Sequence, residues 1–237
     1  MRDSLLEIDG IAAGYGGRPV LECLSLTVQP KQRVGLIGPN GCGKSTLLCA
    51  IVGEAPEVSG SIRFHGNELR GLETSTIVNR GIGYLRQTHN IFPGLTVEEN
   101  LEIAATNGRS RRVRDREQLL EAFPVLDGRE KTRAGLMSGG ERQALAVAMI
   151  LMHPVSLLLL DEPLAGLSQK AANELLGGIA RLHTKEGFAL ILVEHRLNLI
   201  RPHLDRVVVM VRGRIEEDTR DTRLLEDPER LGHLFVI

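Results

Sequence analysis

A glycine-rich octapeptide between an apolar run and a helical stretch is the feature that most constrains how this chain folds. Gly38-Pro39-Asn40-Gly41-Cys42-Gly43-Lys44-Ser45 follows an apolar strand expected over 33–37 and precedes a helix expected over 46–51. Strand, Gly-x-x-x-x-Gly-Lys-Ser and helix in this order are typical of a phosphate-binding P-loop. Glycines let the backbone wrap a polyphosphate closely, and the free N–H groups of the helix start point at its charge. We therefore expect a nucleoside triphosphate site here.

The spacing within this loop assigns a role to each polar side chain. Lys44 is expected to reach the β- and γ-phosphates, and the Ser45 hydroxyl to bind Mg²⁺. The predicted nucleotide-binding residues of the loop are Gly38, Pro39, Asn40, Gly41, Cys42, Gly43, Lys44, Ser45 and Thr46. A minor hypothesis concerns Cys42: a pKa lowered by the helix N-terminus would let oxidation block ATP binding.

Composition excludes several classes of protein. The 237 residues suffice for one large domain, or for one domain with an inserted lobe, without a disulfide or structural metal. A net charge of -1 and 3% aromatic residues do not favour binding to nucleic acid. The three cysteines lack metal-ligand spacing, and Cys23 and Cys49 are expected to be small core residues. No apolar run of signal-peptide or membrane-spanning length is found, so any membrane role is expected to come through a partner.

The apolar pattern divides the chain into an α/β core interrupted by a helical part. Strands are expected over 5–11, 20–28, 59–67 with a turn at 66–67, 81–85, 155–160 and 188–193, with a hairpin over 206–215. Residues 88–154 are predicted to form a helical subdomain, and 1–87 and 155–237 the nucleotide-binding core with its β subdomain. The basic run 109–116 is expected to be a solvated loop or helix face.

An apolar strand that ends in two carboxylates supplies the second part of the site. The run 155–160 is apolar on both faces, as in a central parallel strand, and ends in Asp161-Glu162. Functional groups gather at the carboxyl ends of such strands. Asp161 is expected to hold the Mg²⁺ that Ser45 binds, and Glu162 to orient and deprotonate an attacking water.

Ser138-Gly139-Gly140, at the start of a predicted helix, forms the third part of the site. Free N–H groups, the helix dipole and a hydroxyl make a second place for a phosphate. One chain cannot easily close both loops on one nucleotide, whereas two chains arranged head-to-tail can. We therefore expect a dimer with ATP at the seam.

These residues together resemble the ATP-binding-cassette (ABC) ATPases over nearly the whole chain. The matching motifs are Walker A at Gly38 to Ser45, the Q-loop at Gln87, the signature at Met137 to Glu141, Walker B at Leu157 to Glu162 and the H-loop at His195. The resemblance implies a RecA-like P-loop NTPase core with an N-terminal antiparallel β subdomain and an inserted helical subdomain. It also implies that Tyr15 stacks on adenine, that Gln87 contacts Mg²⁺ or the attacking water, and that His195 senses the γ-phosphate.

Within this family the chain is most similar to the ATPases of branched-chain amino acid importers. Asn90 to Leu101 and Val193-Glu194-His195 carry that similarity. Two positions depart from the general family pattern: Glu141 replaces the signature Gln, and Ser168 replaces the Asp of the D-loop. Both departures resemble the importer group, and the second leaves open how the two sites of a dimer communicate.

The resemblance implies transmembrane permease partners and a second ATPase subunit, either an identical chain or a paralogue. The expected location is the cytoplasmic face of the inner or plasma membrane, reached only through those partners. Two alternatives remain: an exporter ATPase for lipopolysaccharide or another lipid, and a non-transport ABC ATPase acting on ribosomes or DNA. The short insert and single cassette count against the second. No residue of the chain selects the cargo.

Overall fold

The structure is a computed structural model that describes residues 4–88, 90–106 and 113–235. The strands are β1 (Leu6–Tyr15), β2 (Arg18–Val28), β3 (Arg33–Ile37), β4 (Ser59–Phe64), β5 (Asn67–Glu68), β6 (Ile82–Leu85), β7 (Leu157–Asp161), β8 (Ala189–Val193), β9 (Arg206–Val211) and β10 (Arg214–Thr219). The α-helices are α1 (Lys44–Ile51), α2 (Thr74–Asn79), α3 (Val97–Thr106), α4 (Arg116–Ala122), α5 (Gly139–Ile150), α6 (Gln169–Glu186), α7 (Leu197–Ile200) and α8 (Pro228–Phe235). Short 3-10 turns are η1 (Pro124–Leu126), η2 (Ala134–Leu136), η3 (Arg201–His203) and η4 (Thr222–Glu226).

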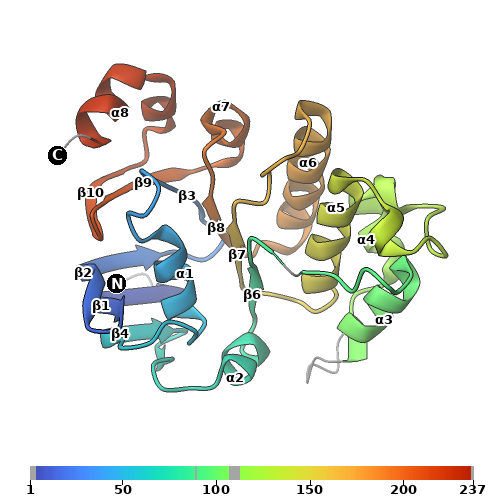
Figure 1. Cartoon of the computed structure of the whole chain (residues 1–237), viewed down its shortest axis with the longest axis horizontal. Coiled ribbons are helices and arrows are strands. Elements are labelled where there is room, and N and C mark those ends of the chain that lie inside the picture. The colour runs from blue at the N-terminus through green and yellow to red at the C-terminus, as the bar shows by residue number, and fades with distance from the viewer. Residues whose placement is uncertain (1–3, 89, 107–112, 236–237) are drawn as a thin grey trace.

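Two sheets organise these elements (Figure 1). An antiparallel sheet has the order β2-β1-β4-β5, and a six-stranded sheet has the order β10-β9-β3-β8-β7-β6. In the larger sheet the ladders β9-β3, β3-β8, β8-β7 and β7-β6 are parallel, and β10 pairs antiparallel with β9. This arrangement confirms the predicted α/β core with an antiparallel β subdomain.

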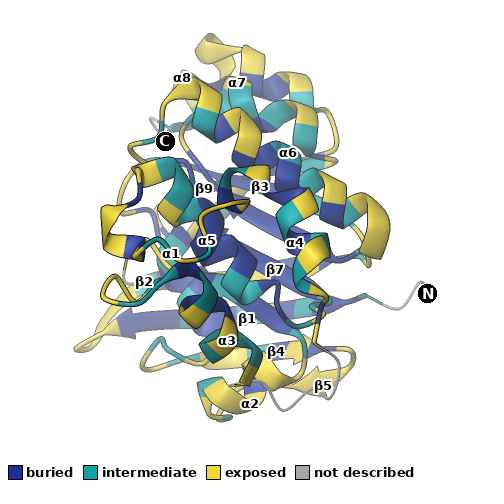
Figure 2. Cartoon of the chain, turned by 90° about the vertical axis from the view of Figure 1, so that its right-hand side faces the viewer, coloured by how far each residue is buried: buried dark blue, intermediate teal, exposed yellow. Residues whose placement is uncertain are grey.

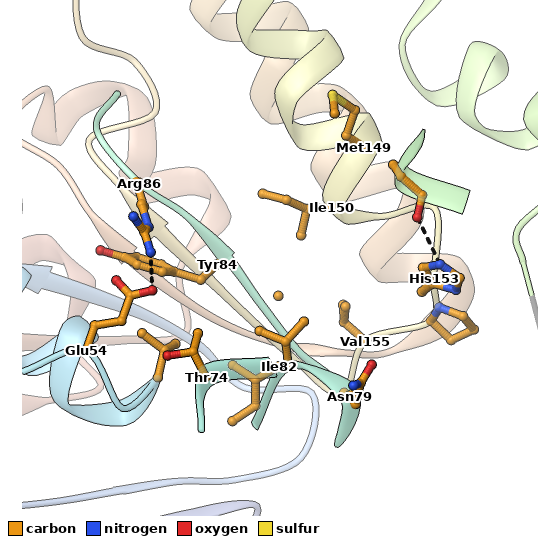
Figure 3. Close-up of a pocket in the computed structure, with 16 residues that line it drawn as sticks. Glu54, Thr74, Asn79, Ile82, Tyr84, Arg86, Met149, Ile150, His153 and Val155 are labelled. Carbon is orange, nitrogen blue, oxygen red and sulfur yellow. Dashed lines mark hydrogen bonds and ion pairs between the residues drawn. The ribbon is translucent and has the colours of Figure 1, made fainter. Parts of the chain in front are cut away.

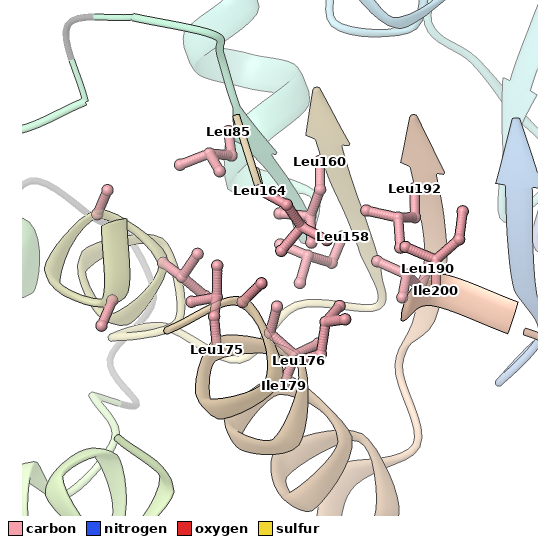
Figure 4. Packing of buried hydrophobic residues seen from close by; sticks show 14 of the residues in the cluster. Leu85, Leu158, Leu160, Leu164, Leu175, Leu176, Ile179, Leu190, Leu192 and Ile200 are labelled. Carbon is pink, nitrogen blue, oxygen red and sulfur yellow. The ribbon is translucent and has the colours of Figure 1, made fainter. Parts of the chain in front are cut away.

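The larger sheet is buried on both faces, as the continuous apolar run of β7 indicates. Side chains alternate along a strand, so β7 serves two cores. Leu157 and Leu159 belong to the cluster that includes α1, while Leu158 and Leu160 belong to the cluster that includes α5 and α6. Figure 4 shows the second face, where side chains of α6 such as Leu175 lie opposite the strands. Helices α1 and α5 therefore lie on opposite faces of one sheet. Figure 2 shows the strands of the larger sheet mainly in the dark blue of buried residues.

The segment between β6 and β7 is mainly helical. It contains α3, α4 and α5, which lie together to the right of the sheet in Figure 1. Helix α3 begins after a reciprocal pair of bonds, in which Thr96 N–H donates to Glu99 Oε2 at 2.7 Å and Glu99 N–H to Thr96 Oγ1 at 3.2 Å. This is the capping pattern that the Thr-x-x-Glu spacing predicts.

Several local expectations differ from the structure. β1 runs on to Tyr15, because an irregularity at Gly10, with φ of 55°, lets the chain re-enter the ladder. Helix α1 begins two residues earlier than predicted, at Lys44. Cys23 is exposed with φ of 50°, so its assignment to the core is wrong, and Cys49 is only partly buried.

The basic run 109–116 also differs where it can be followed. Residues 109–112 lie outside the described residues. Arg114 is buried, 7% exposed, and its Nε donates to Glu186 Oε1 at 2.6 Å. Arg116 pairs with Glu98 at 2.8 Å. A solvated face is therefore the wrong description for Arg114. In the part of the chain that the structure describes, none of the helices is both long enough and apolar enough to span a bilayer.

Candidate functional site

The P-loop connects β3 to α1, and two of its glycines are required by close contacts. A Cβ on Gly38, whose φ is 153°, would lie 2.0 Å from the Met210 carbonyl oxygen of β9. Gly43 caps α1 with φ of 106°, and a Cβ there would lie 2.7 Å from Leu21 Cδ2. L-residues with side chains rarely adopt these φ values. The turn after β9 supports the loop as well, because Gly213 N–H donates to the Cys42 carbonyl at 2.9 Å.

Lys44 lies inside the loop rather than in solvent. It is 5% exposed, and its Nζ donates to the carbonyls of Gly38 at 2.8 Å and Pro39 at 2.9 Å. Phosphate oxygens are stronger acceptors than carbonyls for an ammonium, so a bound polyphosphate can take over these donors. Asn40 and Gly41 are exposed at the tip of the loop, and Thr46 is buried at 9%.

Asp161 ends β7 beside the start of α1 and is 2% exposed. Burial raises the pKa of its carboxyl group, which the Ser45 hydrogen bond and the Lys44 ammonium oppose. Its Oδ1 is buried without a hydrogen-bond partner among the described residues. A free carboxylate oxygen next to a serine hydroxyl is the donor set that Mg²⁺ prefers. The described residues contain no group of three or more His, Cys, Asp or Glu side chains able to hold a metal.

Glu162 and His195 lie together at the next position along the same sheet edge. Their Oε1 and Nε2 atoms are 3.0 Å apart. Glu162 adopts φ of 50°, unusual for a residue with a side chain, and its N–H donates to the Val193 carbonyl at 3.0 Å. A left-handed φ at a residue with a side chain costs roughly 1–3 kcal/mol of conformational free energy, and residues in this conformation are often found at functional sites. The strand ends of β7 and β8 therefore bring together two residues that are 33 positions apart in sequence.

Gln87 and Tyr15 are exposed at the margin of this region. Gln87 follows β6 by two residues, in a loop closed by Asn90, whose Nδ2 donates to the Arg86 carbonyl at 2.6 Å. Tyr15 ends β1, is 49% exposed and pairs with Arg18 across a glycine turn. An exposed aromatic ring can stack on a base.

The Ser138 loop lies at the N-terminus of α5, on the sheet face opposite to α1. Ser138 and Gly139 are exposed, and Gly140 is packed so closely that a Cβ would lie 2.8 Å from Ala171 Cβ. Glu141 closes a capping box: Ser138 N–H donates to its Oε2 at 2.7 Å, and its own N–H donates to Ser138 Oγ at 3.3 Å. The hydrogen bond from the Ser138 N–H to its carboxylate lowers the pKa of Glu141. The unusual Glu of the signature thus has a structural role within its own helix.

The hypothesis of a reactive Cys42 is wrong. The thiol is 5% exposed, and burial raises the pKa of Cys42 despite the neighbouring Lys44. A raised pKa disfavours the thiolate, which is the species that oxidants attack.

Two residues next to His195 were not singled out from the sequence. Glu194 is 3% exposed, and its carboxylate accepts from the Leu164 N–H at 2.6 Å and from the His195 N–H at 3.0 Å. Arg196 Nη1 donates to the Leu167 carbonyl at 2.8 Å. The sequence does contain a signal for Glu194: this carboxylate directly follows the apolar strand 189–193, just as Asp161 follows the apolar run 155–160.

Comparisons with known proteins agree with this geometry. A family model described as ABC transporter matches residues 21–165. The high-affinity branched-chain amino acid transport ATP-binding protein BraG of Pseudomonas aeruginosa is 39% identical over 95% of this chain and 97% of its own length. The probable branched-chain amino acid transport ATP-binding protein LivF of Archaeoglobus fulgidus is also 39% identical, over 90% and 91%.

The solved structures lead to the same family. A crystal structure of a nucleotide-free ATP-binding cassette from an ABC transporter superimposes with a TM-score of 0.82 at 26% identity, covering 98% of each chain. A crystal structure of the ADP conformation of MJ1267, an ATP-binding cassette of an ABC transporter, superimposes with a TM-score of 0.80 at 26% identity, also covering 98% of each chain. The matched fold, solved in one case in its ADP conformation, supports nucleotide binding by this chain. The chain therefore belongs to the ABC transporter family, as an ATP-binding protein of the kind that hydrolyses ATP.

Proposed function

We propose that this protein powers import of branched-chain amino acids by hydrolysing ATP on the cytoplasmic face of a membrane, attached through separate membrane-spanning subunits. The observation that carries the hydrolytic part is the Glu162–His195 pair at 3.0 Å, next to the P-loop. The cargo is supported by the two relatives at 39% identity, whose names refer to branched-chain amino acid transport.

The residues around the P-loop divide the chemistry among themselves. Lys44 and the loop N–H groups hold the phosphates, Tyr15 stacks on the adenine, and Ser45, Asp161 and Gln87 are the proposed Mg²⁺ ligands, directly or through water. The ion neutralises charge on the phosphates when bound. Glu162 orients and deprotonates the attacking water, and His195 donates a hydrogen bond to the γ-phosphate.

A second ATP-binding chain completes each site in this proposal. Ser138 and the P-loop are on opposite faces of one sheet, which supports a phosphate contact between chains rather than within one. A head-to-tail pair with a two-fold axis then contains two equivalent sites. The partner is a second copy or a paralogue; two relatives of one P. aeruginosa strain, BraG and BraF, are 39% and 30% identical to this chain.

Mixing two inactive variants tests the two-chain site. Lys44→Ala should remove phosphate binding, and Ser138→Arg should block the contact across the seam. A mixture of the two chains contains pairs in which one site is intact, so up to about a quarter of the normal ATPase activity should return. Activity that stays absent in the mixture, while the unaltered chain alone is active, would contradict a site completed by a second copy.

A groove beside Gln87 is the proposed docking place for the membrane subunit. It has a volume of about 330 Å³ and is lined between the edge strand β6 and helix α5 by apolar side chains such as Val78, Ile82 and Ile150. Figure 3 shows the polar pairs at its ends: Arg86 with Glu54, and His153 with the Ala104 carbonyl at 3.1 Å. A short amphipathic helix from the cytosolic side of a permease fits an apolar groove with charged ends.

Substitution within the groove tests this docking. Val78 is 44% exposed, and Val78→Glu should abolish co-purification with the membrane subunit because a carboxylate would be desolvated in the interface. Val113, exposed to the same 44% outside the groove, provides the matched control as Val113→Glu. Retained co-purification of the Val78 variant, or equal loss in both, would contradict docking in this groove.

The cargo is tested with the co-purified complex in lipid vesicles. ATP-dependent uptake of leucine, isoleucine or valine is the expected result. Relatives named for spermidine/putrescine import are 30–31% identical, so spermidine is the informative competitor. Uptake of the polyamine, or ATP-dependent movement of a lipid, in place of the branched-chain amino acids would contradict the proposed cargo.

A further inference from the structure

The turn that follows Glu162 is attached to the loop carrying His195 by side chains of that loop. This turn comprises residues 163–168, and it connects the end of β7 to the start of α6. Its backbone makes two short-range bonds: Ala165 N–H donates to the Glu162 carbonyl at 3.2 Å, and Leu167 N–H donates to the Leu164 carbonyl at 3.1 Å. Leu164 is fully buried, and the remaining polar groups of the turn need partners from elsewhere.

Glu194 supplies the first of these partners. Its side chain is buried at 3%, directly after β8. Oε1 accepts from the Leu164 N–H at 2.6 Å, while Oε2 accepts from the N–H groups of His195 at 3.0 Å and Arg196 at 3.5 Å. One carboxylate thus joins the turn after the general base to the backbone of the histidine. Burial raises the pKa of Glu194 and the three N–H donors oppose that shift.

Arg196 supplies the second partner for the turn, this time as a hydrogen-bond donor. Its Nη1 donates to the Leu167 carbonyl at 2.8 Å, three residues beyond Leu164. The two ends of the turn are therefore held by two neighbours of one histidine. The same turn also meets the signature helix, because a Cβ on Gly139 would lie 3.8 Å from Leu167 Cδ2.

We propose that Glu194 and Arg196 are positioning residues that fasten the turn 163–168 to the His195 loop, so that Glu162 and His195 keep their alignment during hydrolysis. Neither residue is among the proposed nucleotide-binding residues. The two side chains give the turn a fixed place between His195 and the Ser138 loop. The inference rests on the proposed roles of Glu162 and His195 in hydrolysis.

Glu194→Gln is the sharpest variant, since it keeps the shape and replaces one acceptor oxygen by an N–H₂ group. Both carboxylate oxygens of Glu194 face backbone N–H donors, and an N–H₂ group cannot accept from them. The variant must therefore lose its bond either to Leu164 or to the backbone of His195 and Arg196. The kcat for ATP should fall about tenfold or more while KM changes less than about twofold, because the P-loop is untouched. Amide exchange in peptides covering 163–168 should accelerate by at least about tenfold.

Arg196 provides an independent variant with its own rescue. Arg196→Ala should lower kcat and speed exchange in the same peptides, and Arg196→Lys, which keeps one donor for the Leu167 carbonyl, should recover most of both. Glu174→Gln, on the exposed side of α6, is the matched control and should leave kcat and exchange unchanged. Because Arg196 is only partly buried, its variants remain informative if Glu194→Gln does not fold.

The proposal is overturned if Arg196→Ala, or a folded Glu194→Gln, keeps kcat within about twofold of the unaltered chain, or leaves exchange over 163–168 unchanged. These outcomes differ from failure of the proposed catalytic roles. If Glu162→Gln keeps normal turnover, Glu162 is not the general base, whereas the exchange measurement on the turn is independent of that result.

Discussion

Carboxylates that follow the strands of one sheet edge have three different environments in this protein. Asp161 is buried with one oxygen free of partners, Glu194 is buried with both oxygens engaged, and Glu162 is partly exposed beside His195. Their environments therefore differ in the way expected for the proposed metal ligand, the proposed positioning group and the proposed general base. The first and third could be recognised from the Walker B spacing, whereas the second depends on a contact with Leu164, 30 residues away.

An ion pair outside the site makes the stability of the fold depend on pH. Asp205 accepts from the Arg33 guanidinium at 2.6 and 3.0 Å and from the Arg33 N–H at 3.0 Å, and these bonds hold the pKa of Asp205 below its ordinary value. A depressed folded pKa gives a stabilisation that is complete above the unfolded pKa and is lost as pH falls through the folded pKa.

Asp205→Asn should therefore lower the free energy of unfolding at pH 7 by about 1 kcal/mol, a value reduced for partial exposure of the pair. The difference between variant and unaltered chain should shrink below about pH 4. Urea unfolding from pH 7 to pH 3 measures it, with Asp127→Asn on the exposed surface as control. A difference that grows towards pH 3 would have the wrong sign for this pair.

At the level of elements, the helical part is joined to α6 by an ion pair whose arginine is buried and whose glutamate is exposed. Arg114 lies just before α4 and pairs with Glu186 at the C-terminal end of α6; its N–H also donates to the Met152 carbonyl at 2.7 Å. The charge pattern of this segment indicated only a basic run. Its burial depends on the position of α6, more than 50 residues later in the chain, which periodicity within the run cannot reveal.

Arg114→Ala should lower the free energy of unfolding by about 2 kcal/mol, because it removes the hydrogen bonds of a buried guanidinium to Glu186, whose exposed carboxylate remains solvated. Arg116→Ala is the matched control: its pair with Glu98 is partly exposed on both sides, and the loss should stay below about 1 kcal/mol. Denaturant unfolding of both variants measures the contrast. Equal losses of unfolding free energy in the two variants would contradict a larger stabilisation by the buried Arg114 than by the partly exposed Arg116.

Strands and helices were predictable where the apolar pattern is strong. β7 and β8 are apolar on both faces and match the expected runs within two residues. β1 was predicted too short, since Gly10 ends the alternation although the ladder continues beyond it. Likewise α1 begins inside the P-loop, where glycine and lysine give no helical signal.

For the whole molecule, the arrangement of two loops on opposite faces of one sheet is the central result. Because the Walker A and signature motifs are separate segments of the sequence, their spacing predicted two phosphate-binding places but not their faces. The alternation of Leu157 and Leu159 against Leu158 and Leu160 assigns α1 and α5 to different faces. The partner and cargo follow from surfaces and relatives rather than from the site itself.

Turnover by Glu162→Gln tests this account most directly. The full chain carrying this substitution should bind ATP with a Kd within about twofold of the unaltered protein, because the P-loop and Lys44 are unchanged. Its kcat should fall by about 100-fold or more, since the amide cannot accept the proton of the attacking water. Glu121→Gln, on the exposed face of α4, is the control for loss of one carboxylate. Weak binding together with turnover within about tenfold of the unaltered chain would contradict the assignment of Glu162 as the general base.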